Sequence, residues 1–196
     1  SGWIASGPNV LKFEEALSVC HDGRPARVVT SATAALELAL QVAGVGPGDE
    51  VITSAMTFFA AANMILKVGA KPVFVDCDLV TRNIDIDQVR AAVSPRTRAI
   101  MPTHFGGLPV DLDGLYAIAR EHGLRVIEDA ALAIGSSWRG RRSGAFGELV
   151  AFSFHPNKNM TTIEGGALLM KDAAQAKPVT NRGLPGDVAS PCRPPA

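Results

Sequence analysis

The sequence has 196 residues, a length typical of one domain, and 47% of them are hydrophobic and 19% charged. This composition excludes an intrinsically disordered chain and allows a buried core. The 19 Lys and Arg residues balance the 19 Asp and Glu residues, so no net charge attracts nucleic acid or an anionic membrane.

Short apolar runs rich in valine and isoleucine alternate with longer segments of helical periodicity. This alternation is typical of β-α units around a mostly parallel sheet, and it predicts the α/β class. In chain order we expect a helix over 10–20, a strand over 26–30, a helix over 32–43, a strand over 50–53, a helix over 58–68, a strand over 72–75, a helix over 86–93, a strand over 98–102, a helix over 112–122, and strands over 125–128, 149–153 and 166–170.

Local signals mark the ends of some of these elements. Asp85 is a residue type that caps helix N-termini, and Gly123 is placed as the C-terminal residue of a helix. The last 20 residues hold five of the 13 prolines and show neither helical nor strand periodicity. We therefore expect a domain over 1–172 and an irregular, proline-rich tail over 173–196.

Several classes of protein and site are disfavoured. The most apolar stretch, residues 55–66, is too short to cross a bilayer, and the N-terminus lacks the pattern of a secretion signal, so a cytoplasmic location is expected. The three cysteines are far apart and the four histidines lack ligand spacing, which argues against disulfides and a metal site. The glycines of residues 44–48 follow a helix and precede a strand, the wrong order for a dinucleotide site.

Residues 28–35 run from a strand through small and hydroxylated residues directly into a helix. The free amides of the first helical turn, the helix dipole and the hydroxyls of Ser31 and Thr33 together suit a phosphate group. The same residues also fit an ordinary helix cap, and this alternative stays open.

A second segment, residues 126–131, places Glu128 and Asp129 at the carboxyl end of a buried strand. Ligands of open α/β sheets gather at that edge. A carboxylate there favours the protonated form of a heterocyclic nitrogen, although a strand-end Asp is also common as a simple cap.

The third segment places Lys158 after a strand end, beside hydroxyls and glycines. A lysine whose pKa is lowered by burial or by a neighbouring cation forms a Schiff base with carbonyls, whereas most lysines are only solvated. A phosphate cradle, an acid for a ring nitrogen and this amine are the groups that hold pyridoxal phosphate. Phe58 or Phe59 could cover the ring or pack in the core, and the arginines at 139, 141 and 142 fit a solvated turn or an anion contact.

Together these residues resemble the DegT/DnrJ-type sugar aminotransferases, which are pyridoxal-phosphate enzymes of fold type I. The resemblance covers roughly residues 1–172 and implies a three-layer αβα large domain. It rests on these segments in order: SGWIASGPNVLKFEEAL, SATAALELAL, GPGDEVITSAMTFFAAAN, GAKPVFVD, RTRAIMPTHFGGLPVDLD, GLRVIEDAALAIGS, GRRSGAFG and AFSFHPNKNMTTIEGGALL.

The resemblance implies a role for each matching residue. Lys158 matches the lysine that bonds to the cofactor and shuttles a proton, and Asp129 matches the acid that pairs with the pyridine nitrogen. Ser153, Ala32 and Thr33 match the phosphate contacts, and Phe58 matches the aromatic that stacks on the ring.

The implied reaction moves an amino group from an amino acid, usually glutamate, to a nucleotide-linked keto-sugar. Such aminosugars enter lipopolysaccharide, other polysaccharides or glycosylated antibiotics. Family members are homodimers whose partner chain completes the cofactor site.

The sequence departs from the family in three respects, one of which is that the match is expected to begin after a missing N-terminal segment and to stop near Asp172. Leu132 stands where the family usually has His or Gln, which removes a polar contact to the cofactor. Family members are also about twice as long and carry a smaller C-terminal domain that is absent here, so a truncated form is expected. The alternatives are a catalytically inactive remnant and a sugar dehydratase, although related dehydratases resemble the family with His in place of the lysine.

Overall fold

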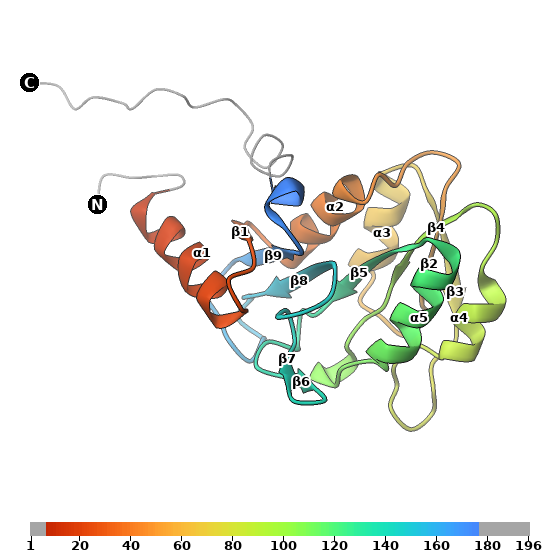
Figure 1. Cartoon of the computed structure of the whole chain (residues 1–196). Helices are drawn as coiled ribbons and strands as arrows, with labels where there is room; N and C mark the ends of the chain where they lie inside the picture. Colours follow the sequence, from red (N-terminus) through yellow and green to blue (C-terminus); the bar gives the residue numbers. More distant parts are fainter. Residues whose placement is uncertain (1–6, 177–196) are drawn as a thin grey trace, which may run out of the picture.

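The computed structural model describes residues 7–176, in which seven strands form one sheet in the order β1-β9-β8-β5-β4-β2-β3 (Figure 1). The strands of this sheet are β1 (Ala26–Val29), β2 (Glu50–Ser54), β3 (Lys71–Val75), β4 (Thr97–Met101), β5 (Arg125–Asp129), β8 (Leu149–Ser153) and β9 (Gly166–Met170). The helices are α1 (Pro8–Cys20), α2 (Ala32–Val42), α3 (Ala60–Lys67), α4 (Ile86–Ala92), the 3₁₀ helix η1 (Phe105–Gly107) and α5 (Leu112–His122).

The sheet is mostly parallel, as the sequence predicts. Strands β3, β2, β4, β5 and β8 pair in parallel, while β9 runs antiparallel to both of its neighbours, β8 and β1. Every residue of β2, β8 and β9 is buried. Strands covered on both faces read as nearly continuous apolar runs, which explains why β8 and β9 show no alternation of polar and apolar residues.

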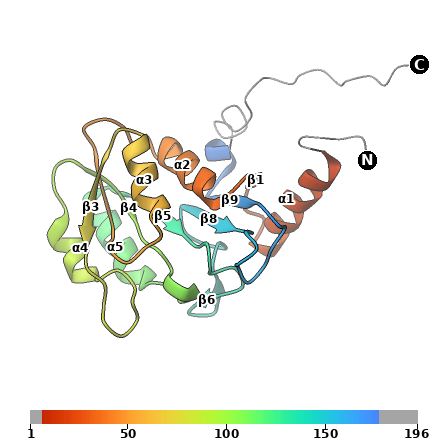
Figure 2. The same cartoon turned by 180° about the vertical axis from the view of Figure 1, so that it is seen from behind.

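Helices cover both faces of the sheet and give three layers (Figure 2). Ile127 packs in one core cluster with residues of α2 and α3, whereas Val126 packs in another with residues of α4 and α5. A third cluster joins α1 to the side chains of β8 and β9 that face away from α2. Consecutive strand residues point to opposite faces, so this division follows from the strands themselves.

The two helix caps predicted from the sequence are present in the structure. Asp85 accepts hydrogen bonds from the amides of Asp87 and Gln88, and Gly123 ends α5 with a φ of 65°. Glycine adopts that left-handed conformation without the steric penalty of a Cβ atom. All twelve predicted elements occur, with ends that move by up to two residues.

Three details differ from the sequence expectation. Helix α3 begins at Ala60 rather than at residue 58, and Phe59 before it provides no side-chain cap. The arginine-rich turn is a hairpin of β6 (Ser137–Trp138) and β7 (Arg141–Arg142), whose strands are too short to show periodicity. Residues 173–176, expected to be irregular, are helical, and Asp172 accepts a hydrogen bond from the amide of Gln175. The rest of the expected tail, 177–196, lies outside the described residues.

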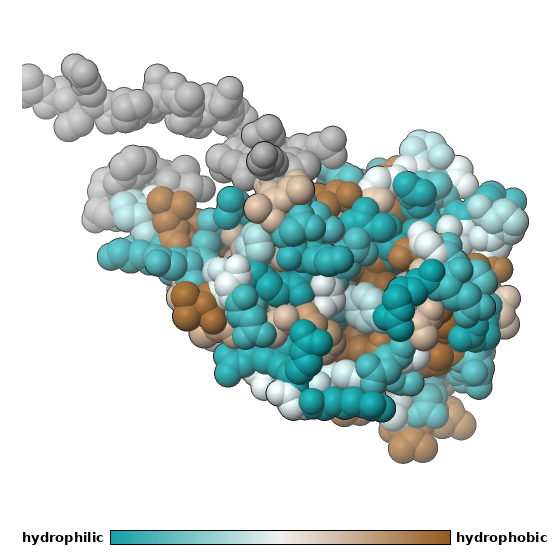
Figure 3. All heavy atoms as spheres, viewed as in Figure 1, coloured by the Kyte–Doolittle hydropathy of each residue, from teal (hydrophilic) through white to brown (hydrophobic). Residues whose placement is uncertain are grey.

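Hydrophilic residues cover much of the face seen in Figure 3, with hydrophobic residues scattered between them. Among the helices of residues 7–176, none is both long and apolar enough to cross a membrane.

Candidate active site

A cavity of about 660 Å³ lies at the edge of the sheet where β5 and β8 end and α2 begins. Clefts at the carboxyl ends of parallel strands are the usual ligand sites of such sheets. All six residues predicted from the sequence border this one cavity: Ala32, Thr33, Phe58, Asp129, Ser153 and Lys158. A second cavity of about 570 Å³, beside α5 and the start of β8, is bordered by none of the six.

The first turn of α2 presents free amides at the cavity. The hydroxyl of Ser31 accepts a hydrogen bond from the amide of Ala34, and its carbonyl accepts one from Ala35. The amides of Ala32 and Thr33 have no partner among the described residues. The helix cap and the predicted anion site therefore coexist, because Ser31 uses only the third and fourth amides of the helix.

Gly166, the first residue of β9, brings this helix start close to the sheet. A Cβ atom at this position would lie 2.5 Å from the amide nitrogen of Ala32 and would collide with the carbonyl group of Ser31. Gly166 pairs with Ser153 in the β8–β9 ladder. The close approach thus places the hydroxyl of Ser153 and the amides of α2 at one end of the cavity.

Asp129, the last residue of β5, is 4% exposed and borders the cavity. Its Oδ1 atom accepts a hydrogen bond of 3.1 Å from the amide of Ala131, and its Oδ2 atom has no partner among the described residues. Burial raises the pKa of this carboxyl group, while the Ala131 amide and the neighbouring His104 and Lys158 act in the opposite direction. One carboxylate oxygen is therefore available to a ligand.

Lys158 lies in the loop between β8 and β9, where its amide donates to the carbonyl of His155 in a tight turn. Its amine has no hydrogen-bond or ion-pair partner among residues 7–176. Because Lys158 and Asp129 border the same cavity, the structure brings together the amine and the acid that the sequence only places at separate strand ends.

Phe58 and Phe59 form a tilted aromatic pair with ring centroids 4.1 Å apart. Both are well exposed, at 61% and 64%, so neither packs in the core. Of the two, Phe58 borders the cavity, so it is the one placed to contact a ligand there.

Several polar residues of the cavity are not among those predicted from the sequence. The hydroxyls of Thr57 and Thr103 lie 2.7 Å apart at its wall, and His104 and Glu164 also border it. Thr103 and His104 directly follow β4, which neighbours β5 in the sheet, so the same strand-end rule could have found them. Leu132 borders the cavity and is 37% exposed, so its side chain contributes an apolar surface there.

Comparison with known proteins identifies the relatives of this chain. The model of the DegT/DnrJ/EryC1/StrS aminotransferase family matches residues 1–187. The spore coat polysaccharide biosynthesis protein SpsC of Bacillus subtilis is 47% identical over 186 residues, which are 95% of this chain and 48% of that protein.

Solved structures agree. S. venezuelae DesV, in complex with a ketimine intermediate, superposes with a TM-score of 0.91 at 38% identity, covering 96% of this chain and 52% of that one. DesI, in the presence of its TDP-sugar product, superposes with a TM-score of 0.84 at 41% identity, covering 92% and 46%.

The chain thus spans about half the length of the relatives it matches. The mostly parallel, helix-covered sheet is that of pyridoxal-phosphate-dependent aminotransferases of fold type I, and pyridoxal 5′-phosphate is the cofactor of this family. By its sequence over nearly its whole length and by its fold, the chain belongs to the DegT/DnrJ/EryC1/StrS aminotransferase family.

Proposed function

We propose that this chain binds pyridoxal 5′-phosphate in the 660 Å³ cavity and belongs to a transaminase that moves an amino group from an amino acid, glutamate, to a nucleotide-linked keto-sugar. The observation that carries the proposal is the convergence of an unpaired lysine amine, a buried carboxylate and free helix amides on that cavity. The product would enter lipopolysaccharide or another polysaccharide. The name of the Bacillus subtilis relative supports the polysaccharide, and the TDP-sugar of DesI supports the nucleotide link.

The residues of the cavity fit the cofactor. A phosphate would find hydrogen-bond donors in the free amides of Ala32 and Thr33 and in the hydroxyl of Ser153. The free oxygen of Asp129 can accept a hydrogen bond from a protonated ring nitrogen. Each of these groups lacks a strong partner in the protein, which is the condition expected of groups that a ligand satisfies.

When bound, pyridoxal phosphate supplies an electron sink that stabilises negative charge on a substrate carbon. The protein's part is to bind, orient and move protons. Lys158 Nζ would bond to the cofactor aldehyde and, once released from it, accept and return the substrate proton. Asp129 would keep the ring nitrogen protonated, and Phe58 would lie against the ring and exclude water from one side.

The inactive-remnant alternative and the dehydratase alternative make different demands on the same residues. A remnant would fail to hold the cofactor, whereas a dehydratase would hold it and remove a hydroxyl. The presence of Lys158 at the loop position that matches the family lysine favours the transaminase over the dehydratase.

We also infer that the complete protein is a cytoplasmic homodimer with a further, smaller C-terminal domain. The exposed pair Phe58 and Phe59 supports a partner chain at this edge, because large apolar side chains in contact with each other are commonly covered in an assembly. Sedimentation of the complete protein tests the dimer.

The first experiment is cofactor titration followed by absorbance. Wild-type chain should develop a band near the visible edge with pyridoxal phosphate, and Lys158→Ala should abolish it. Lys171→Ala is the matched control, because Lys171 is exposed and lies at the other cavity. Absence of the band in the wild type would favour the remnant.

The second experiment identifies the reaction of the complete protein. Glutamate and a keto-sugar nucleotide are supplied, and the products are analysed by mass spectrometry. A new sugar amine supports the transaminase, whereas a deoxy-keto product without an amine would establish the dehydratase.

A further inference from the structure

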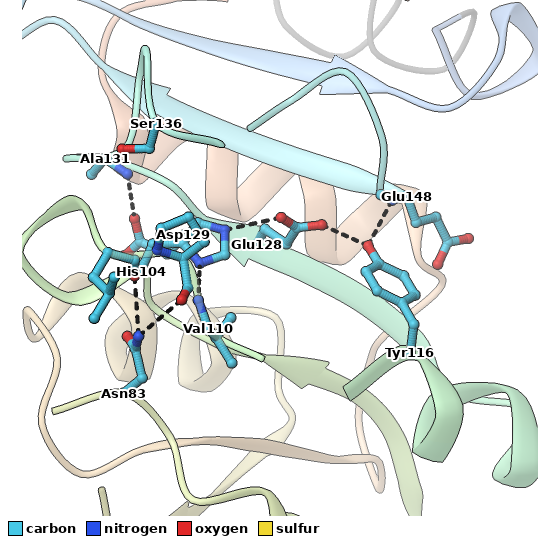
Figure 4. A network of polar contacts seen from close by, with 12 residues as sticks. Asn83, His104, Val110, Tyr116, Glu128, Asp129, Ala131, Ser136 and Glu148 are labelled. Carbon is cyan, nitrogen blue, oxygen red and sulfur yellow. Dashed lines mark hydrogen bonds and ion pairs between the residues drawn. The ribbon is translucent and has the colours of Figure 1, made fainter. Parts of the chain in front are cut away.

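A buried polar network joins the segment after β4 to the end of β5 (Figure 4). The side chain of Glu128 lies on the face of β5 opposite Asp129, and His104, which also borders the cavity, contacts it. Glu128 Oε2 lies 2.9 Å from His104 Nε2, and Glu128 Oε1 accepts a 2.6 Å hydrogen bond from the hydroxyl of Tyr116. His104 and Glu128 are at most 1% exposed. The proposed function gives this network no task.

The direction of each hydrogen bond follows from its partners. The amide of Val110 donates to His104 Nδ1 at 3.2 Å, so that nitrogen carries a lone pair and the ring proton lies on Nε2. Glu128 therefore accepts from both His104 and Tyr116 and acts as a carboxylate. The pKa of Tyr116 is raised by burial and by Glu128, which fits a hydroxyl that keeps its proton beside a negative charge.

These contacts form a closed ring with the backbone of Asp129. The amide of His104 donates to the carbonyl of Asp129 at 3.0 Å, and the amide of Asp129 donates to the carbonyl of Pro102 at 2.9 Å. The side chain of His104 reaches Glu128, the residue before Asp129. The segment after β4 is thus bonded to the end of β5 through both backbone and side chain.

The Asp129 carboxylate depends on this backbone for its direction. Its only donor among the described residues is the amide of Ala131, two positions along the same chain segment. A shift of the Asp129 backbone would therefore move the carboxylate and its donor together, without any other side chain to hold them in place.

We propose that His104 and Glu128 are a positioning pair that holds the Asp129 carboxylate at the cavity for the ring nitrogen of the cofactor. Glu128 takes the only N–H of the imidazole from the reverse face of the sheet, and the resulting ring of bonds fixes the end of β5. The inference rests on the proposed function, since it concerns the same cavity.

A purely structural role of the His104–Glu128 pair and a positioning role predict different effects on ligand affinity. A buried polar pair that only stabilises the fold would, when broken, weaken every ligand of the cavity alike. A positioning role through Asp129 weakens only ligands that carry the ring nitrogen. Pyridoxal phosphate and its 1-deaza analogue, in which carbon replaces that nitrogen, separate the two roles because they share the aldehyde and the phosphate.

The experiment measures dissociation constants of both compounds for the 196-residue chain and its variants. His104→Phe removes the imidazole donor, and Glu128→Gln removes the negative charge and one of the two acceptor oxygens, so that His104 and Tyr116 can no longer both donate to a carboxylate. Val126→Ala is the control, since it opens a hole on the same face of β5 without touching the network. Circular dichroism checks that each variant is folded, and Glu128→Gln decides the result if His104→Phe does not fold.

We expect the two network variants to bind pyridoxal phosphate at least about tenfold more weakly and to bind the deaza analogue as the wild type does. Val126→Ala should leave the ratio of the two constants unchanged. Equal weakening of both compounds, or no weakening, would overturn the inference and leave the proposed function standing. A wild type that binds neither compound would overturn both.

A second measurement uses the chain without cofactor. Nitrogen-15 chemical shifts of His104 should show a proton on Nε2 and none on Nδ1. The opposite tautomer would contradict the network, whatever the binding data show.

Discussion

Gly166→Ala tests the close approach between β9 and the first turn of α2. The new Cβ atom would lie 2.5 Å from the amide nitrogen of Ala32 and overlap the carbonyl group of Ser31, both of which are backbone atoms. Backbone cannot rotate away as a side chain does, so we place the cost at the upper end of the usual 1–3 kcal/mol for overpacking, about 3 kcal/mol. Alanine restricts the unfolded chain and returns about 0.4–1 kcal/mol. The net loss of stability is about 2 kcal/mol.

The assay is urea unfolding, combined with titration of pyridoxal phosphate. Because the displaced atoms belong to the helix start that offers its amides to the phosphate, cofactor affinity should fall together with stability. Gly46→Ala is the matched control, since Gly46 has an ordinary φ and open space around its Cβ position, and it should be neutral or slightly stabilising. If Gly166→Ala were as stable as Gly46→Ala and bound the cofactor equally well, the steric argument would be refuted.

Three further predictions concern charge and capping. Hydrogen bonds from Ser94 and Arg96 lower the pKa of Glu50 from 4.5 to about 2. The ionised Glu50 therefore stabilises the fold fully above pH 4.5, and this stabilisation is lost as the pH falls toward 2. The difference in the free energy of unfolding between the wild type and Glu50→Gln should shrink across this pH window. Asp85→Ala should lower the free energy of unfolding by about 1 kcal/mol in urea titration, because α4 loses its cap. Asp129→Asn should stabilise the cofactor-free chain at pH 7 and weaken cofactor binding, since burial raises the pKa of that carboxyl group; calorimetry should show the gain disappearing below pH 3.8.

The sequence predicts the elements well because hydrophobic periodicity and caps are local. Helix α5 has its N-terminal cap at Asp111 and its C-terminal cap at Gly123. Both signals adjoin the eleven residues of the helix, so they can be recognised from the sequence alone. The β6–β7 hairpin was missed because two-residue strands contain no period.

The candidate site could be predicted only in part. Asp129 and Lys158 could be predicted from the rule that ligands bind at the carboxyl ends of strands. Asp129 ends β5, and Lys158 lies in the loop that follows β8, and both strands are recognisable in the sequence. The pairing of His104 with Glu128 could not be predicted, since it requires the parallel neighbourhood of β4 and β5, which the sequence does not specify. The steric role of Gly166 likewise depends on the position of Ser31 in space rather than in the chain.

Several residues that line the cavity lower the stability of the fold. A buried carboxylate without full hydrogen bonding, an exposed aromatic ring and helix amides without partners each cost stability, and they occur at Asp129, Phe58 and the start of α2. At Asp85 and Gly123, by contrast, the local signals and the packing agree. Because such conflicts are expected where a protein binds a ligand, the meeting of these three at one cavity is an argument for the site that does not depend on the relatives of the chain.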